Sequence, residues 1–309
     1  MEFVDIQVNG YAGVSFHENE APTEEQMQLV IERLLAGGVR AILPTVTTNA
    51  VPFMAERLAH LRRLIDQDAD LRRMMPAFHI EGPCLSPVEG YRGAHPEQHC
   101  IPATREVLDP LLDAAGGVER VAMVTLAPEC DRDLATTRWL SESGIIVCAG
   151  HTDAPLDMLR EAEQAGLSFF THLGNGSAAT MDRHDNIINR AMALEHVRYS
   201  LVADGHHVPF FVLAQYIRLL GIERCIFTSD CIAAADAPPD CKLNERFEVD
   251  WSTDTPVVRL KGTPYLGGAA LTMAQAHRNA TEHLGLTAAE AKALCDDQPA
   301  ALISKWLRD

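Results

Sequence analysis

Short apolar runs alternate with segments of helical periodicity along almost the whole chain, and this alternation constrains the fold more than any other feature. The β-prone runs are 3–8, 39–43, 75–80, 121–126, 145–149, 167–170, 199–203 and 225–228. Strands that alternate with helices form parallel sheets, because each crossover returns the chain to the same sheet edge. Eight such units predict an α/β fold of the (β/α)8 TIM-barrel type, whose usual length the 309 residues slightly exceed.

The connecting segments agree with this prediction. Helical patterns are expected at 23–36, 52–66, 104–115, 132–143, 155–165 and 209–220, whereas a polar loop follows 167–170. A doubly wound open sheet is the alternative, but the first run lacks the Gly-x-Gly-x-x-Gly that a dinucleotide-binding sheet needs.

Two additions to the barrel are expected. Residues 247–251 and 257–260 predict a hairpin before the last helices, and 83–102 predict a long loop folded over the opening. No linker, repeat or low-complexity tract interrupts the chain, so we expect a single domain over residues 1–309.

Composition limits the kinds of binding partner and the cellular compartment that we expect for this protein. The net charge of −17 and the pI near 5.1 oppose binding to nucleic acid or to an anionic membrane surface. No apolar run approaches the roughly 18 residues that cross a bilayer, and the N-terminus lacks a basic export signal. Eight cysteines lie scattered without a Cys-x-x-Cys pair, so we expect a reducing, cytoplasmic location.

Four strand ends carry side chains suited to hydrolysis: Glu81, His151, His172 and Asp230. In a parallel barrel these ends share one mouth, so residues far apart in sequence can meet there. Two imidazoles and a carboxylate bind a divalent metal and leave a position for water. Taken singly, each histidine has the alternative of a hydrogen-bonded structural role, and the aspartate that of a helix cap. Together they predict a metal-dependent hydrolase.

Eight motifs, in the same order along the chain, resemble those of the N-acetylglucosamine-6-phosphate deacetylase family of the amidohydrolase superfamily. They are DIQVNG (5–10), HIEGP (79–83), RGAH (92–95), VTLAPE (124–129), AGHT (149–152), THLGNG (171–176), DGHH (204–207) and GGAALTM (267–273). The resemblance spans nearly the whole chain. It implies that Glu81, His151 and His172 bind the metal, that Asp230 is the catalytic acid and base, and that His95 contacts the substrate and stabilises the oxyanion.

The resemblance also implies the cofactor, the substrate and the assembly. Gln7 and Asn9 stand where many amidohydrolases have a His-x-His pair, which favours one metal ion over two. Zinc is the first expectation, and iron, manganese and cobalt are alternatives because nitrogen and oxygen ligands accept all of them. The enzyme is expected to be a homodimer. Its substrate is expected to be an N-acetyl amino sugar phosphate, bound through Asn175, Gly176, Arg183, His207 and Gly268. A solvated loop arginine remains the alternative for Arg183.

Departures from the family pattern leave other substrates open. The family flanks its barrel with a small β-sandwich, whereas this sequence starts at the first strand and stops at 306–309, so we expect the barrel without that sandwich. Gly174 and Gly176 replace an aromatic residue and an alanine, and Ser229-Asp230-Cys231 replaces Thr-Asp-Ala. A different sugar, another N-acyl compound, a cyclic amide or an ester remains an alternative, as does a non-catalytic sugar-phosphate-binding regulator. Retention of Glu81, His151, His172 and Asp230 together argues against the regulator, because a binding protein needs no general base.

Overall fold

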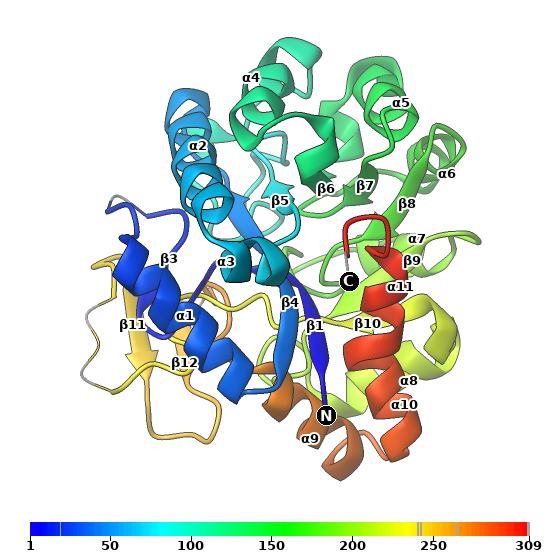
Figure 1. Ribbon diagram of the computed structural model, residues 1–309. Helices are drawn as coiled ribbons and strands as arrows, with labels where there is room; N and C mark the ends of the chain where they lie inside the picture. The colour runs from blue at the N-terminus through cyan, green and yellow to red at the C-terminus, as the bar shows by residue number, and fades with distance from the viewer. Residues whose placement is uncertain (19, 240, 242, 264, 308–309) are drawn as a thin grey trace.

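The computed structural model describes residues 1–18, 20–239, 241, 243–263 and 265–307, and within them eight parallel strands form one sheet. In sheet order these strands are β1 (Phe3–Val8), β4 (Val39–Thr47), β5 (Phe78–Glu81), β6 (Val121–Leu126), β7 (Ile146–Ala149), β8 (Leu167–Phe170), β9 (Arg198–Leu201) and β10 (Cys225–Phe227). A parallel bridge between Val8 and Cys231 joins the first strand region to the last. The sheet therefore closes, and the predicted (β/α)8 barrel is confirmed (Figure 1).

Helices follow the strands around the outside of the barrel (Figure 1). They are α1 (Glu24–Ala36), α2 (Val51–Gln67), α3 (Ala69–Met74), α4 (Arg105–Ala115), α5 (Ala135–Glu142), α6 (Leu156–Gln164), α7 (Ile187–Met192), α8 (Phe210–Leu220), α9 (Met273–Glu282), α10 (Ala288–Lys292) and α11 (Gln298–Leu302). Local signals set several starts. Thr23 and Gln26 form a capping box at α1, for example, and satisfy backbone N–H groups that lack helical partners.

Two predicted segments differ from the structure. The helix expected from residue 132 begins only at Ala135, because Asp133 and Leu134 adopt left-handed backbone angles (φ 55° and 54°) that interrupt an α-helix. The polar loop expected after β8 ends in the short helix α7, which starts where the Asn186 side chain accepts a hydrogen bond from the N–H of Asn189.

Alternate residues of the strands pack into two separate hydrophobic clusters. Val4 and Ile6 of β1 belong to the cluster inside the barrel, together with Phe169 of β8, which is fully buried. Ile303 and Trp306 close the bottom of that cluster from the C-terminal segment, and α11 contacts both β1 and β10. The remaining faces of the strands pack against the outer helices. Burial of one large apolar side chain contributes about 1.5–3 kcal/mol, so this core fixes the strand ends firmly.

The seam between β1 and β10 is closed by a buried carboxylate. Asp5 is 3% exposed and accepts hydrogen bonds from the hydroxyl of Thr228 at 2.5 Å and from the backbone N–H of Ser229 at 3.2 Å. The hydroxyl of Ser229 donates to the same carboxylate at 2.5 Å. Because these residues directly precede Asp230, the seam also fixes the position of that aspartate.

The long loop lies at the mouth and the hairpin forms, as predicted, and the hairpin also lies at the mouth. The hairpin consists of β11 (Phe247–Asp250) and β12 (Val257–Leu260), and two further short strands, β2 (Gly10–Tyr11) and β3 (Val14–Ser15), follow β1. Arg246, next to the hairpin, donates from Nη2 to the carbonyl oxygen of Ala94 at 3.0 Å. Tyr265, beyond the hairpin, donates from its hydroxyl to Glu89 at 3.2 Å. These bonds tie the hairpin region to the loop that carries His95.

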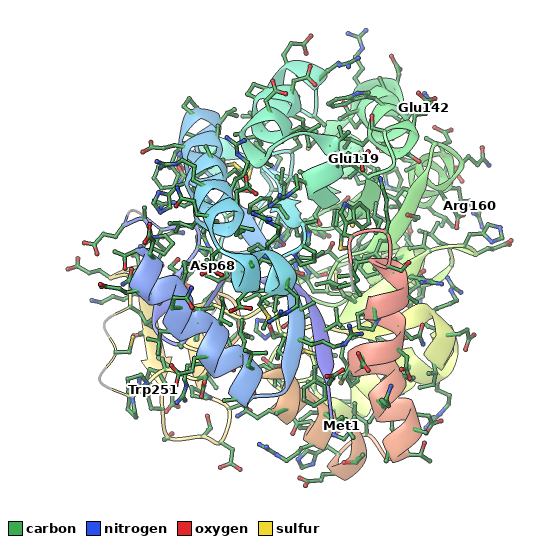
Figure 2. All side chains as sticks on the ribbon, viewed as in Figure 1. Met1, Asp68, Glu119, Glu142, Arg160 and Trp251 are labelled. Atoms are coloured by element: carbon green, nitrogen blue, oxygen red, sulfur yellow. The ribbon has the colours of Figure 1, made fainter. Side chains whose placement is uncertain are left out.

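Exposed charged side chains lie on the outer helices, away from the mouth. Glu142 and Arg160, which are both exposed, project from the periphery in Figure 2. Within the described part of the chain, no helix combines the length and the apolar character that crossing a membrane requires.

Candidate active site

Three of the four predicted residues at the strand ends have an unusual backbone conformation. His151, His172 and Asp230 lie just beyond β7, β8 and β10 and have φ values of 51°, 34° and 49°. Left-handed angles cost a non-glycine residue on the order of 1–3 kcal/mol, and such residues concentrate at functional sites. The barrel core holds them in this conformation, which directs all three side chains into the mouth.

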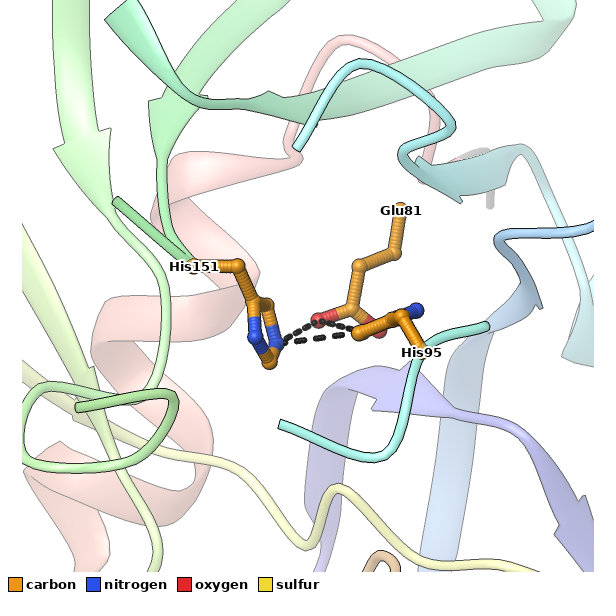
Figure 3. A group of neighbouring side chains, drawn as sticks. All are labelled: Glu81, His95 and His151. Carbon is orange, nitrogen blue, oxygen red and sulfur yellow. Dashed lines mark hydrogen bonds and ion pairs between the residues drawn. The ribbon is translucent and has the colours of Figure 1, made fainter. Parts of the chain in front are cut away.

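Glu81 and three histidines converge on one point. Oε1 of Glu81 lies 3.2 Å from Nε2 of His151 and 3.0 Å from Nε2 of His172, and these two nitrogens are 3.2 Å apart. Nε2 of His95, on the loop over the mouth, lies 3.2 Å from that of His151 and 4.0 Å from Glu81 (Figure 3). Glu81, His95 and His151 each offer an atom within 4.8 Å of the others, a spacing that suits one metal ion.

The ring of His151 is held from three sides. Its Nδ1 hydrogen-bonds to the carbonyl oxygen of Tyr91 at 2.9 Å, which directs Nε2 toward Glu81. A Cβ atom at Gly176 would lie 2.6 Å from His151 Nδ1, and one at Gly93 would lie 3.0 Å from its Cε1. Both glycines also have positive φ values, so a larger residue at either place would displace the ring.

The converging nitrogen and oxygen atoms fit a shared cation better than they fit direct contact with one another. Because Nδ1 of His151 donates to a carbonyl, its Nε2 carries a lone pair and no proton when the ring is neutral. That lone pair faces Oε1 of Glu81 and Nε2 of His172 at 3.2 Å. Acceptors that face each other repel, whereas a divalent cation between them would accept a lone pair from each. The residues present therefore fit a metal ion.

Protonation favours a metal ion at Glu81 and His95 but opposes one at His172. Burial alone would raise the pKa of Glu81, but the neighbouring rings of His151, His172 and His95 hold it well below its ordinary value. Burial and the neighbouring His151 lower the pKa of His95 to about 3. Burial would lower the pKa of His172, yet Glu81 and Asp230 raise it, so a metal must compete with a proton at that ring.

Asp230 faces the cluster from the last barrel strand. It is 8% exposed, and burial raises its pKa to about 6 against the opposing effect of His172. Nδ2 of Asn9 donates to Asp230 Oδ1 at 2.9 Å, and Oδ1 of Asn9 is buried without a hydrogen-bond partner among the described residues. Asp230 therefore offers a proton acceptor, and Oδ1 of Asn9 beside it offers a hydrogen-bond acceptor that no described residue uses.

A cavity of about 330 Å³ surrounds these groups. The predicted residues Asn175, Gly176, His207 and Gly268 line it, and Nδ2 of Asn175 is a buried donor without a partner among the described residues. Arg183 lies in an exposed segment and is not among the described residues that line the cavity.

His207 is the titratable group among the predicted substrate-binding residues that line the cavity. Its Nδ1 lies 2.6 Å from Oδ2 of Asp204. Burial would lower the pKa of His207, but Asp204 raises it above its ordinary value. The ring therefore tends to carry a positive charge, which suits an anionic ligand group.

Several cavity residues were not predicted from the sequence. His17 and Glu18 line the cavity from the segment after β1, and Arg246 lines it from the base of the hairpin. Tyr91 acts through its backbone, which no sequence pattern marks. His17 and Glu18 had one usable signal, because they lie in the segment between the first barrel strand and the first helix.

A closed (β/α)8 barrel whose strand ends gather a carboxylate and imidazoles around one point, with a buried aspartate facing them, defines a metal-dependent hydrolase of the amidohydrolase type.

No family model matches the chain, but known proteins do. It is 30% identical to N-acetylglucosamine-6-phosphate deacetylase of Danio rerio over 97% of this chain and 74% of the relative. It is 32% identical to N-acetylgalactosamine-6-phosphate deacetylase of Shewanella sp. (strain ANA-3) over 98% of this chain and 73% of the relative. The chain belongs to the N-acetylglucosamine-6-phosphate deacetylase family and is a metal-dependent amidohydrolase.

Solved structures of the family superpose on nearly the whole chain. The deacetylase from Pasteurella multocida gives a TM-score of 0.83 at 27% identity, over 98% of this chain and 76% of that chain. A mutant of the deacetylase from Mycobacterium smegmatis, solved in complex with N-acetyl-D-glucosamine-6-phosphate, gives 0.85 at 25% identity, over 98% and 77%.

Proposed function

We propose that this enzyme removes the acetyl group from an N-acetyl amino sugar 6-phosphate, with N-acetylglucosamine 6-phosphate as the first candidate, and releases the amino sugar phosphate and acetate. The observation that carries the proposal is the convergence of Glu81, His151 and His172 opposite Asp230, in a cavity whose other wall presents Asn175 and His207.

Glu81, His151 and His172 would hold one divalent metal ion. When bound, such an ion lowers the pKa of its water and polarises a carbonyl. Gln7 and Asn9 provide no imidazole for a second ion, which supports a mononuclear site. Zinc is our first assignment because two histidines and one carboxylate are a common catalytic zinc set.

Asp230 acts as the general base and then as the general acid. A pKa near neutrality lets it take a proton from the attacking water and return it to the amine that leaves. Asn9 supports this role because its amide fixes Asp230, while its free Oδ1 can accept the second hydrogen of the water. The hydrogen bonds of Asp5 with Thr228 and Ser229 hold the Asp230 carboxylate in position opposite the metal ligands.

His95 stabilises the oxyanion that forms on the acyl oxygen. Its low pKa keeps the ring neutral, so it can donate one hydrogen bond without carrying a charge. The hydrogen bond from Arg246 to Ala94 fixes the loop beside it. Although His95 lies close enough to act as a ligand, we assign the third ligand position to His172, which is nearer to Glu81.

The phosphate is bound at the wall formed by Asn175, Gly176, His207 and Gly268. The unpartnered amide N–H of Asn175 and the His207 ring, charged through Asp204, supply donors to an anion. Arg183 is exposed and lies outside the cavity of its own subunit. We therefore propose that it contacts the phosphate bound in the second subunit of a homodimer. The scattered cysteines, several of them buried thiols, support a reducing cytoplasmic location.

N-acetylgalactosamine 6-phosphate is a second candidate, because the similarity to the Shewanella deacetylase is as extensive as that to the N-acetylglucosamine-6-phosphate deacetylases. The glycines at 174 and 176 leave more room at this wall than an aromatic residue and an alanine would. Either sugar uses the same catalytic groups.

Acetate release from purified enzyme loaded with Zn²⁺ tests the proposal. The substrates are N-acetylglucosamine, N-acetylgalactosamine and N-acetylmannosamine, each with and without a 6-phosphate. We expect rapid release from at least one 6-phosphate and a much lower kcat/KM for its unphosphorylated form. No release from any of them, or equal rates with and without phosphate, would overturn the assignment.

A further inference from the structure

Directly beneath the candidate metal ligands, the barrel contains a buried polar layer that the proposed reaction does not use. Its residues come from four of the motifs in the sequence: His79, Thr125, Gly150 and Thr171. His79 lies two residues before Glu81 on β5, so the two side chains share the inner face of that strand. Gly150 directly precedes His151, and Thr171 directly precedes His172. None of the four residues lines the cavity above them.

A chain of hydrogen bonds runs through this layer. Nδ1 of His79 donates to the carbonyl oxygen of Ile6 at 3.0 Å, because a carbonyl can only accept. Nε2 of His79 lies 2.8 Å from Oγ1 of Thr125, which lies 2.8 Å from Oγ1 of Thr171. The imidazole is buried, which favours its neutral form, so Nε2 accepts from Thr125 and Thr125 accepts from Thr171. The chain therefore has one direction and leaves neither nitrogen of His79 unpaired.

The chain joins strands that backbone pairing does not join. In the sheet, each strand is hydrogen-bonded only to its neighbours. The bond between His79 and Ile6 connects β5 to β1 past β4, and the bond between the two threonines connects β6 to β8 past β7. Glu81 ends β5 and His172 lies just beyond β8, three strands further along the sheet. The layer therefore braces the barrel between these two ligands.

Gly150 leaves the space in which the two threonines meet. A Cβ atom at this position would lie 2.8 Å from Cγ2 of Thr125 and 3.1 Å from Cβ of Thr171. Carbon atoms in favourable contact are about 3.5–4.0 Å apart, so any other residue would push the threonines away from each other. Gly150 does not have a positive φ, so the requirement here is space and not backbone conformation.

The polar layer replaces apolar packing at one level of the barrel only. Below it, the interior is filled by apolar side chains such as Val4 and Phe169. A fully paired buried network adds little to stability over apolar packing, but it rigidifies a core and fixes one arrangement of its groups. The level at which this network lies, immediately below the ligands, is the level at which their spacing is set.

We propose that His79 is a positioning residue for the metal centre. Through Thr125 and Thr171 it holds Glu81 and His172 at the spacing that one divalent cation requires, with Oε1 of Glu81 3.0 Å from Nε2 of His172. This inference rests on the proposed function, because Glu81 and His172 are its metal ligands. His79 itself touches neither the cation nor the substrate.

A purely structural role for the chain leads to a different expectation. If the chain only stabilised the barrel, its loss would lower the Tm of the metal-free protein and leave the Zn²⁺ affinity of the folded molecules unchanged. If the chain positions the ligands, Zn²⁺ affinity falls in protein that is still fully folded. Affinity and Tm measured on the same samples therefore distinguish the two roles.

The experiment measures Zn²⁺ affinity of the full chain by competition with a chelating dye, below the Tm of each metal-free protein. Thr125→Val removes the central hydroxyl and keeps the size of the side chain, whereas His79→Phe removes both ring nitrogens. We expect each variant to bind Zn²⁺ about 10-fold more weakly, the usual effect of losing a group that orients metal ligands. Thr125→Ser keeps the hydroxyl and should bind Zn²⁺ with nearly wild-type affinity. Should His79→Phe fail to fold, Thr125→Val and Thr125→Ser decide the test.

Ile303→Ala is the matched control, because Ile303 is fully buried in the apolar cluster inside the barrel but belongs to the segment that closes its bottom. It should lower the Tm of the metal-free protein at least as much as Thr125→Val does and leave Zn²⁺ affinity unchanged. Wild-type affinity in either chain-breaking variant, equal weakening in Ile303→Ala, or no recovery in Thr125→Ser would overturn the role of His79. Absence of stoichiometric Zn²⁺ binding by the wild type would instead refute the metal site of the proposed function.

Discussion

Asp230→Asn separates catalysis from stability at the centre of the site. The substitution keeps the size of the side chain and an oxygen that can accept from Asn9, but it removes the group that accepts a proton. General acid–base catalysis contributes about 10²–10⁴-fold, and Asp230 acts in both directions, so we expect kcat to fall at least about 10³-fold. Metal content, measured on the same samples, should stay at the wild-type level.

The same variant should be more stable without metal at alkaline pH. Burial raises the pKa of Asp230 from 3.8 to about 6, so ionising it in the folded state costs about 3 kcal/mol, since one pKa unit is about 1.4 kcal/mol. A carboxyl with a raised pKa favours folding at low pH and loses that contribution as the pH rises through about 6. Asparagine avoids this loss, so at pH 8 the variant should gain up to about 3 kcal/mol, or about 5 °C in Tm.

Urea and thermal unfolding of metal-free wild type and Asp230→Asn at pH 8 and pH 4 measure this gain. It should shrink toward zero at pH 4, where the wild-type carboxyl is protonated when folded. A variant that keeps more than about a tenth of wild-type kcat, or one that is less stable than the metal-free wild type at pH 8, would refute the reasoning about Asp230.

Four further variants probe the remaining parts of the site. His172→Asn should abolish stoichiometric metal binding, whereas His95→Asn should keep the metal and lower kcat about 100-fold; the reverse pattern in metal analysis would exchange their roles. Gly176→Ala should weaken metal affinity about 10-fold, because its Cβ would displace the imidazole packed against it, and unchanged affinity by metal titration would contradict that contact. Asp204→Asn should lower the pKa of His207, so KM for the 6-phosphate should start to rise at a lower pH than in the wild type, with kcat little changed; identical KM–pH profiles would reject the charged His207.

The barrel and the convergence of Glu81, His151 and His172 could be predicted because both depend on local patterns. Short apolar runs mark the strands, and the polar residue at or beyond the end of a run marks the mouth, which is how the sequence predicted that Glu81, His151 and His172 meet. The start of α5 was missed because left-handed angles at Asp133 and Leu134 carry no compositional signal.

Other features depend on tertiary packing that the sequence does not encode locally. Arg246 reaches the cavity only because the hairpin folds back over the loop that carries Ala94. The role of Gly176 depends on the ring of His151, which lies 25 residues earlier in the chain and meets it only across the mouth. The extent of a single domain and the homodimer remain predictions, which sedimentation of the full chain can test.

The most direct measurement is an anomalous-scattering map of crystals of the metal-loaded enzyme. One strong peak should lie within bonding distance of Glu81, His151 and His172, with Asp230 facing it across the position of the attacking water. A peak bound elsewhere, or the absence of any peak from protein that turns over substrate, would contradict catalysis by this centre.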